Sequence, residues 1–206
     1  IRASNGVIII TTKKGSTGAP QFNYTANVSL GKVTKQVDVM TGPEYEKFIK
    51  EYFPSRANSL GIADPTDPTK RIIYDTNWQD QIYRNAISTD HNFSARANLY
   101  QKIPFRASVG YTKNEGLIKT SDYQRFNYSI KMTPKFWDDH LKVDINAKGT
   151  LTDKNAIDEG GAIGGAINMD PTKPVYDATS NKFGGYYQNT ILNGNFNKLE
   201  GSSNPL

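Results

Sequence analysis

The chain contains no cysteine and only two histidines, His91 and His140. Without cysteine, a disulfide scaffold, a Cys-ligated zinc site and a thiol nucleophile are all excluded. The two histidines lie far apart and no H-E-x-x-H motif is present, so we expect no metal site and no cofactor. Paired carboxylates such as Asp138 and Asp139 are typical of a turn, and we therefore expect no catalytic residues and no enzyme.

Long hydrophobic runs are also missing. No stretch approaches the roughly 18 apolar residues of a membrane-spanning helix, and no charged segment followed by an apolar run marks a signal peptide. The 206 residues are 36% hydrophobic and 11% aromatic, which is not a disordered composition. The chain begins at Ile1 and ends in a polar stretch, so we expect a fragment of a longer protein.

The basic residues are scattered rather than massed on one segment. The formal net charge of +5 would permit a nucleic-acid partner. A sheet that binds single-stranded nucleic acid needs aromatic side chains on its polar face for base stacking. In this sequence the aromatic residues fall mainly on the apolar side of the strands. We therefore expect no nucleic acid.

The main pattern is an alternation of apolar and polar residues with a period of two, which is typical of strands with one apolar and one polar side. In "FNYTANVSLGK", for example, Phe22, Tyr24 and Ala26 alternate with Asn23, Thr25 and Asn27. The pattern predicts five strands, which begin at Phe22, Phe93, Phe105, Phe126 and Leu141. Short gaps between several of them predict an antiparallel sheet and an all-β fold.

The connections between these strands alternate in length. Tight turns are predicted at "QKIP" and around "WDDH", whereas long or medium segments join the other strand ends. Short turns at one end and long loops at the other are typical of a bacterial outer-membrane β-barrel. Strands of about nine residues or more, with aromatics near their ends, favour the same fold. A soluble β-sandwich would give identical alternation and stays open as the alternative.

In a barrel the polar side of these strands would line the lumen. Candidates for a substrate path are the amide and basic side chains of that side. They are Asn23, Asn27, Arg96, Asn98, Arg106, Lys131 and Asn146.

Several motifs resemble one family in their order along the chain. "NGVIIITTKKG" (residues 5–15) resembles the end of the plug domain of SusC/RagA-type TonB-dependent outer-membrane transporters, and "FNYTANVSL" resembles their first barrel strand. "NWQDQIYRNA", "HNFSARANL", "ASVGYTKNEGLIKTSDYQRFNYSIKM" and "NMDPTKPVYD" follow in the order of that family. The apolar run near the N-terminus, with no alternation, fits a plug strand covered on both faces.

The resemblance implies a domain organisation. Residues 1–15 would end the plug, residues 16–153 would form the first five barrel strands with extracellular loops 1 and 2, and residues 154–206 would begin a long extracellular loop with a possible next strand. A transporter of this class closes with about 22 strands around a plugged lumen. We therefore expect antiparallel strands of a large barrel, with long extracellular loops that carry short helices.

The resemblance also implies a function. A member would import a nutrient actively across the outer membrane, with energy supplied through TonB and a SusD-like lipoprotein over the extracellular mouth. The substrate would be an oligosaccharide first and a peptide second, and the lipid bilayer would contact the strands. The alternative is a soluble β-sandwich carbohydrate-binding module of a secreted protein.

Three segments outside the strands carry further expectations. "TGPEYEKFIKEYF" predicts a short amphipathic helix with Thr41 as its N-cap. The Pro-bearing stretch 63–70 predicts turns, because its Asp64 and Asp67 lack EF-hand spacing. The glycine-rich stretch 158–171 shows no evident strand-to-helix context and no phosphate-loop motif. The resemblance places it in the third extracellular loop, where Asn168, Asp170 and Tyr176 are candidates for contact with substrate or lipoprotein.

Overall fold

The computed structural model describes residues 19–138, 140–177, 182–193, 196–199 and 204–206. The proposed plug segment, residues 1–15, lies outside the described residues. The chain forms two compact units. One is a sheet, and the other, here called the loop cluster, comprises residues 31–86, 116–121 and the described residues from 156 onward.

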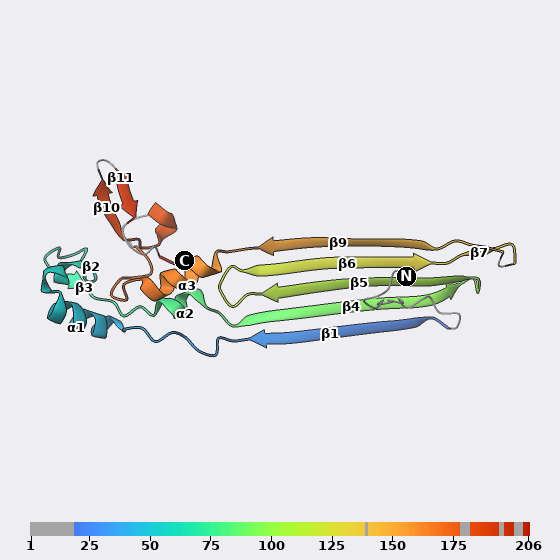
Figure 1. Ribbon diagram of the computed structural model, residues 1–206, viewed down its shortest axis with the longest axis horizontal. Coiled ribbons are helices and arrows are strands. Elements are labelled where there is room, and N and C mark those ends of the chain that lie inside the picture. The colour runs from blue at the N-terminus through green and yellow to red at the C-terminus, as the bar shows by residue number, and fades with distance from the viewer. Residues whose placement is uncertain (1–18, 139, 178–181, 194–195, 200–203) are drawn as a thin grey trace, which may run out of the picture. The chain divides into compact units, whose positions relative to one another are not determined.

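The sheet contains five strands in the order β1-β4-β5-β6-β9. Figure 1 shows neighbouring strands running in opposite directions, and the prediction of an antiparallel sheet is confirmed. The strands have 11 to 14 residues, longer than usual in globular sheets. Their bounds are Gln21–Gly31, Ala86–Leu99, Ile103–Glu115, Asp122–Met132 and Ile145–Asn155.

The strand register gives the sheet two chemically different faces. Side chains at directly opposite positions share a face, and we call such a set a row. On the apolar face, one row is Phe93, Val109, Tyr128 and Gly149. On the polar face, one row is Arg96, Arg106, Lys131 and Asn146. Here the turn end is the end with the connections 100–102 and 133–144, and the loop end is the opposite one.

The turn end differs from the prediction in two places. The first turn is at Tyr100 and Gln101, which have φ of 52° and 60°, whereas Ile103 and Pro104 of the predicted turn already belong to β5. The fifth predicted strand is interrupted. Residues Leu141–Lys142 (β8) pair with Lys135–Phe136 (β7) in a separate ladder, and β9 begins only at Ile145. Pro134 has no N–H to donate, which explains why the ladder breaks there.

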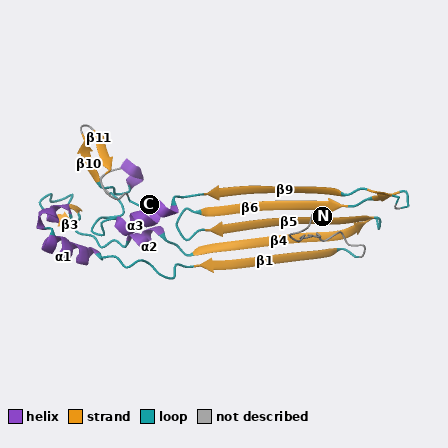
Figure 2. Cartoon of the chain, in the orientation of Figure 1, coloured by secondary structure: helices purple, strands orange, loops and turns teal. Residues whose placement is uncertain are grey.

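The loop cluster contains the helices, as Figure 2 shows. Helix α1, Gly42–Tyr52, begins after Thr41, which forms a capping box with Glu44, so the predicted helix and its N-cap are confirmed. Helix α3, Glu159–Asn168, follows strand β9 and is capped by Asp158. The sequence showed no evident strand-to-helix context in this stretch, so this helix was not predicted. The other elements are η1 (Pro54–Ser59), β2 (Ile62–Ala63), β3 (Arg71–Ile72), α2 (Trp78–Ile82), η2 (Lys182–Gly185), β10 (Thr190–Asn193) and β11 (Phe196–Leu199).

A small apolar core holds the loop cluster together. It is formed by Trp78 and Ile82 of α2, Ile118, and Ala166 and Met169 at the end of α3. These residues come from three separate segments of the chain, so the core joins connections that lie far apart in the sequence. None of the described helices has the length and apolar character needed to cross a membrane.

Candidate functional site

The polar face of the sheet brings together most of the predicted substrate-path residues. Arg96 lies opposite Arg106, Arg106 opposite Lys131, and Lys131 opposite Asn146. Asn98 lies two residues further along β4, on the same face, opposite Pro104. The sequence pattern thus placed five of the candidates on one surface, although it could not show that four of them form one row.

The remaining two strand candidates lie on β1. Asn23 and Asn27 alternate with Phe22 and Tyr24, whose rings stack on apolar-face residues of β4. Both asparagines therefore belong to the polar face, on an edge strand whose residues 21–30 are all exposed. Their amides are available to a ligand or to another part of the protein.

The polar face is strongly basic. On strands β4, β5, β6 and β9, it carries six cationic side chains and one carboxylate, that of Asp90. The carboxylate of Asp90 accepts a hydrogen bond from Thr112 Oγ1 at 2.7 Å, and Arg125 Nη2 lies 3.4 Å from the same hydroxyl. The six cations are Arg96, Arg106, Arg125, Lys131, Lys148 and Lys154.

Among the described residues, five of these cations, all except Arg125, have no ion-pair or hydrogen-bond partner. We call Arg96, Arg106 and Lys131 the cationic row. Within the described part of the chain, no ion pair or hydrogen bond engages their side chains. Nearby, the buried Oδ1 atom of Asn98 also lacks a hydrogen-bond partner among the described residues. This part of the face is suited to accept negative charge and hydrogen-bond donors.

The apolar face has the properties of a lipid-facing surface. Its large side chains remain exposed, for example Val109 at 43%, Phe126 at 42% and Ile145 at 43%. The face changes character toward the loop end, where Lys113, Gln124 and Asp153 form a polar row. The apolar part of β5 therefore runs from Ile103 to Tyr111.

That apolar part has a length that fits a membrane. Eight residue steps of about 3.4 Å give roughly 27 Å along the strand. A tilt of about 40° reduces this to roughly 21 Å along the membrane normal, close to the ~25 Å apolar band of outer-membrane barrels. The aromatic residues Phe105, Tyr111 and Phe126 lie near the two ends of the band, where interfacial girdles are found.

In the loop cluster, Asn168 and Asp170 have local structural roles. The Asn168 amide donates to the carbonyl of Gly164 at 2.8 Å at the end of α3. The Asp170 carboxylate accepts from the backbone N–H and hydroxyl of Thr172, and its carbonyl accepts from Trp78 Nε1 at 3.0 Å. Both residues still line a cleft of about 1000 Å³, so substrate contact remains a prediction.

Tyr176, the third loop candidate, is 62% exposed. Its ring lies 5.2 Å from that of Tyr186, centroid to centroid, and the two residues form an isolated β-bridge. The pair presents aromatic surface to solvent. A separate cleft of about 830 Å³, lined by Ile82, Ile118 and Tyr186 among others, is more apolar.

Sequence reasoning missed Lys173, the residue that joins the segment around Ser59 and Gly61 to the segment after α3. Lys173 is 7% exposed, and its Nζ donates to the carbonyls of Ser59 and Gly61 at 2.5 and 2.7 Å. Burial lowers the pKa of Lys173 and raises the pKa of Tyr187, whose ring Lys173 approaches at 5.9 Å. Since a lone lysine in "DPTKPVYD" has no periodic pattern around it, no sequence signal could have identified this role.

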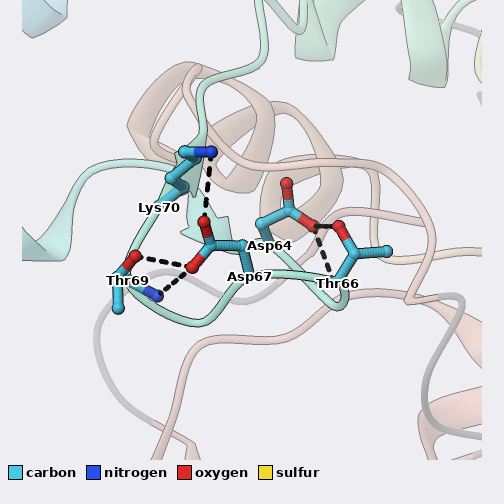
Figure 3. Close-up of polar contacts among 5 residues, drawn as sticks. All are labelled: Asp64, Thr66, Asp67, Thr69 and Lys70. Atoms are coloured by element: carbon cyan, nitrogen blue, oxygen red, sulfur yellow. Dashed lines mark hydrogen bonds and ion pairs between the residues drawn. The ribbon is translucent and has the colours of Figure 1, made fainter.

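Turns were predicted for the stretch 63–70, and residues 64–70 form them, whereas Ala63 ends strand β2 (Figure 3). Asp64 accepts hydrogen bonds from the N–H and hydroxyl of Thr66, and Asp67 accepts them from Thr69 and pairs with Lys70 at 3.1 Å. These bonds lower the pKa of both carboxyl groups. Their oxygens are thus used within the turns.

The curated proteins similar to this chain are TonB-dependent receptors. No family model matches the chain. It is 43% identical over 208 residues to TonB-dependent receptor SusC of Bacteroides thetaiotaomicron, covering 99% of this chain and 19% of SusC. It is 25% identical over 179 residues to TonB-dependent receptor P3 of Formosa agariphila, covering 85% of this chain and 16% of P3. The chain therefore spans a fifth or less of these two curated relatives.

Solved structures show the same fold. The RagAB peptide importer in its closed-closed state aligns with a TM-score of 0.62 over 100% of this chain and 26% of that chain, at 18% identity. A structure of the RagAB peptide transporter aligns with a TM-score of 0.65 over 99% of this chain and 25% of that chain, at 17% identity. At such identities the likeness shows the fold alone.

Proposed function

We infer a role in nutrient import from one premise, which is that this chain belongs to the SusC/RagA-type TonB-dependent receptors. Membership places it in the bacterial outer membrane and makes it part of a transporter rather than an enzyme. We propose that the whole protein imports a nutrient actively. In it the five strands described would belong to a closed barrel of about 22 strands.

The observation that carries this proposal is the two-faced sheet. An exposed apolar band of roughly 21 Å suits lipid, whereas the opposite face carries amides and cations that suit a water-filled or plugged lumen. A soluble β-sandwich would bury its apolar face against a second sheet, yet Val109 and Ile145 at the centre and edge of this face each keep 43% of their surface exposed. The carbohydrate-binding sandwich is therefore the weaker reading.

The proposed substrate is an oligosaccharide, with a peptide as the second candidate. Amides such as Asn23, Asn27 and Asn146 can donate to and accept from sugar hydroxyls, and each such bond is weak enough to be exchanged during passage. The clefts of the loop cluster, near Asn168, Asp170 and Tyr176, would offer further contacts. Peptide transport is stated for the RagAB structures, which are distant in sequence.

Two protein partners are proposed. A SusD-like lipoprotein would close the extracellular mouth, and TonB would supply energy through a part of the protein outside residues 1–206. Both follow from the family, whose members pair with SusD/RagB lipoproteins and TonB. The loop cluster would form part of the surface on which the lipoprotein closes.

The full-length receptor tests this function. It would be extracted from outer membranes in detergent through an affinity tag, its co-purifying proteins identified by mass spectrometry, and the complex titrated with oligosaccharides and with peptides. We expect a stoichiometric lipoprotein and saturable binding of oligosaccharides. Recovery in the soluble fraction, without a lipoprotein, would overturn the proposal; binding of peptides alone would replace the substrate class.

A further inference from the structure

The loop cluster contains three Asp-Pro-Thr turns, at residues 64–66, 67–69 and 170–172. In each turn the Oδ1 atom of the aspartate accepts hydrogen bonds from the backbone N–H and the hydroxyl of the threonine. The first two turns lie on the connection between β2 and β3 (Figure 3), where these bonds are exposed. The third lines the cleft of about 1000 Å³, here called the polar cleft.

The Asp170 carboxylate of the third turn is held in place by only one of its oxygens. Oδ1 accepts from the N–H and the hydroxyl of Thr172 at 2.8 and 2.6 Å, and the backbone carbonyl of Asp170 accepts from Trp78 Nε1. Among the described residues, no hydrogen bond or ion pair engages Oδ2. A fixed carboxylate with a free oxygen is suited to accept from a ligand hydroxyl or N–H.

Two more residues that line the polar cleft are fixed in a similar way. Arg71 donates through Nε to the carbonyl of Leu60 and through Nη2 to that of Gly61, which leaves Nη1 for another acceptor. The Tyr187 hydroxyl donates to Asn189 Oδ1 at 3.1 Å and leaves the Asn189 amide N–H groups available. Each residue thus uses some polar atoms to hold its position and keeps others for a ligand.

Tyr45 and Arg56 add two polar groups to the lining. Within the part of the chain that the structure describes, neither the Tyr45 hydroxyl nor the Arg56 guanidinium forms a hydrogen bond or ion pair. Burial raises the pKa of the Tyr45 hydroxyl, the Asp170 carboxylate raises it further, and Arg56 lowers it. The three groups therefore lie close enough to act on the same ligand.

The mixture of charges in this lining favours one class of ligand. A carboxylate only accepts hydrogen bonds and a guanidinium only donates them, so a matching ligand must donate and accept on neighbouring atoms. Sugar hydroxyls do both. The half-buried rings of Tyr45 and Tyr187 offer apolar surface for the C–H face of a sugar ring. The cleft volume is at the upper end of the ~300–1,000 Å³ that is usual for ligand sites.

We propose that the polar cleft binds a neutral sugar unit of the imported oligosaccharide, in which Asp170 accepts from one hydroxyl while Tyr45, Arg56 and Arg71 donate to others. The inference rests on the proposed function, because it assumes that oligosaccharides reach the loop cluster. It goes further by assigning the residues of one subsite and the charge of the sugar. An acidic sugar unit would place its carboxylate beside the free oxygen of Asp170, and like charges in contact are repelled.

Titration calorimetry of the full-length receptor in detergent tests this site. The probes are neutral hexasaccharides of glucose, of mannose and of galactose, each compared with its own oxidised form, in which the primary alcohols have become carboxylates. We expect saturable binding of at least one neutral probe. Its oxidised form should bind about tenfold more weakly or less tightly still, because of the charge of Asp170.

Three variants separate the cleft from the rest of the receptor. Asp170→Asn keeps Oδ1 for Thr172 but replaces the free acceptor with an amide donor, so the dissociation constant should rise on the order of tenfold. Tyr45→Phe removes a hydroxyl without a described partner, so affinity should fall several-fold with an unchanged thermal midpoint. Asp64→Asn is the matched control, since it alters the same Asp-Pro-Thr turn outside the cleft and should bind like the unmodified receptor.

Several outcomes would overturn the inference. Equal dissociation constants for Asp170→Asn and Asp64→Asn would place the bound sugar elsewhere in a working importer. Tighter binding of an oxidised probe would contradict a neutral sugar, and a transport-active receptor that binds only peptides or none of the neutral probes would contradict the site itself. Failure of the proposed function would instead appear as a receptor absent from the outer membrane.

Discussion

At the scale of single residues, Gly61 holds the most constrained position in the loop cluster. Its φ of +56° is in the left-handed region, and a Cβ atom there would lie 2.0 Å from the carbonyl oxygen of Ile72. Its N–H donates to Thr172 Oγ1 at 2.9 Å, and its carbonyl accepts from Arg71 at 2.8 Å and Lys173 at 2.7 Å. One glycine thus connects segments more than 110 residues apart.

We expect Gly61→Ala to destabilise the loop cluster. The substitution adds about 1–3 kcal/mol of backbone strain and a clash with backbone that no side-chain rotation relieves. Limited proteolysis of the full-length receptor should show faster cleavage within residues 54–72. Gly164→Ala is the matched control, because a Cβ there meets nothing within 4 Å and alanine favours the α3 helix. Equal cleavage rates for both variants would contradict this role of Gly61.

At the scale of secondary structure, the strands and α1 could be predicted because their information is local. The period of two in "FNYTANVSL" and the Thr41 and Glu44 pair each depend on residues within a few positions of one another. Helix α3 could not be predicted, since its four glycines disfavour a helix. It is held by the Asp158 cap and by the burial of Ala166 and Met169 against Trp78 and Ile82, contacts that no local pattern reveals.

In the candidate site, too, one feature could be predicted from local sequence and another could not. The assignment of Arg96, Arg106 and Lys131 to one face follows from the parity of each strand. Their alignment in one row depends on the registers β4–β5 and β5–β6, which the turn at Tyr100 and Gln101 and the 116–121 connection determine. Since a predicted turn displaced by two residues changes every opposite pair, sequence alone could not show the row.

The capping box of α1 gives a pH-dependent prediction. The Glu44 carboxylate accepts from the Thr41 N–H at 2.9 Å and from its hydroxyl at 2.8 Å, and these bonds lower the pKa of Glu44 below its ordinary 4.5. A lowered folded-state pKa means that the contribution is fully present above pH 4.5 and is lost as the pH falls through the lowered value. Amide protection of residues 45–48, corrected for intrinsic exchange, should fall in that acidic range.

Two variants test the origin of that pH dependence. Glu44→Gln cannot titrate, so its protection should change less between pH 6 and pH 3, a range of about three pH units around the ordinary carboxyl pKa. Thr41→Ala removes the cap and should cost about 1 kcal/mol of helix stability at neutral pH. A Glu44→Gln profile identical to that of the unmodified protein would show that another group is responsible.

At the scale of the whole molecule, the proposed function requires one face of this sheet to contact lipid and the other to line the lumen. The two faces are fixed together by strand parity, so an error in orientation would put Arg96, Arg106, Lys131 and Lys148 into hydrocarbon. That arrangement is excluded energetically, because each lipid-facing cation near the midplane costs about 2–4 kcal/mol. The charge asymmetry of the faces therefore determines the orientation more strongly than the apolar residues alone.

A pair of arginine substitutions tests the orientation. Val109 belongs to the apolar row with Phe93 and Tyr128 near the middle of the band, so Val109→Arg should cost about 2–4 kcal/mol and reduce assembly into the outer membrane. Asn92→Arg adds the same side chain one row position away on the polar face, on the strand that carries Asp90, and should assemble normally. Both variants of the full-length receptor are measured by outer-membrane fractionation and by heat-modifiable migration in gels. If Val109→Arg assembles as well as Asn92→Arg, the lipid-facing side of the sheet is assigned wrongly, and the cationic row would then need a different environment from a lumen.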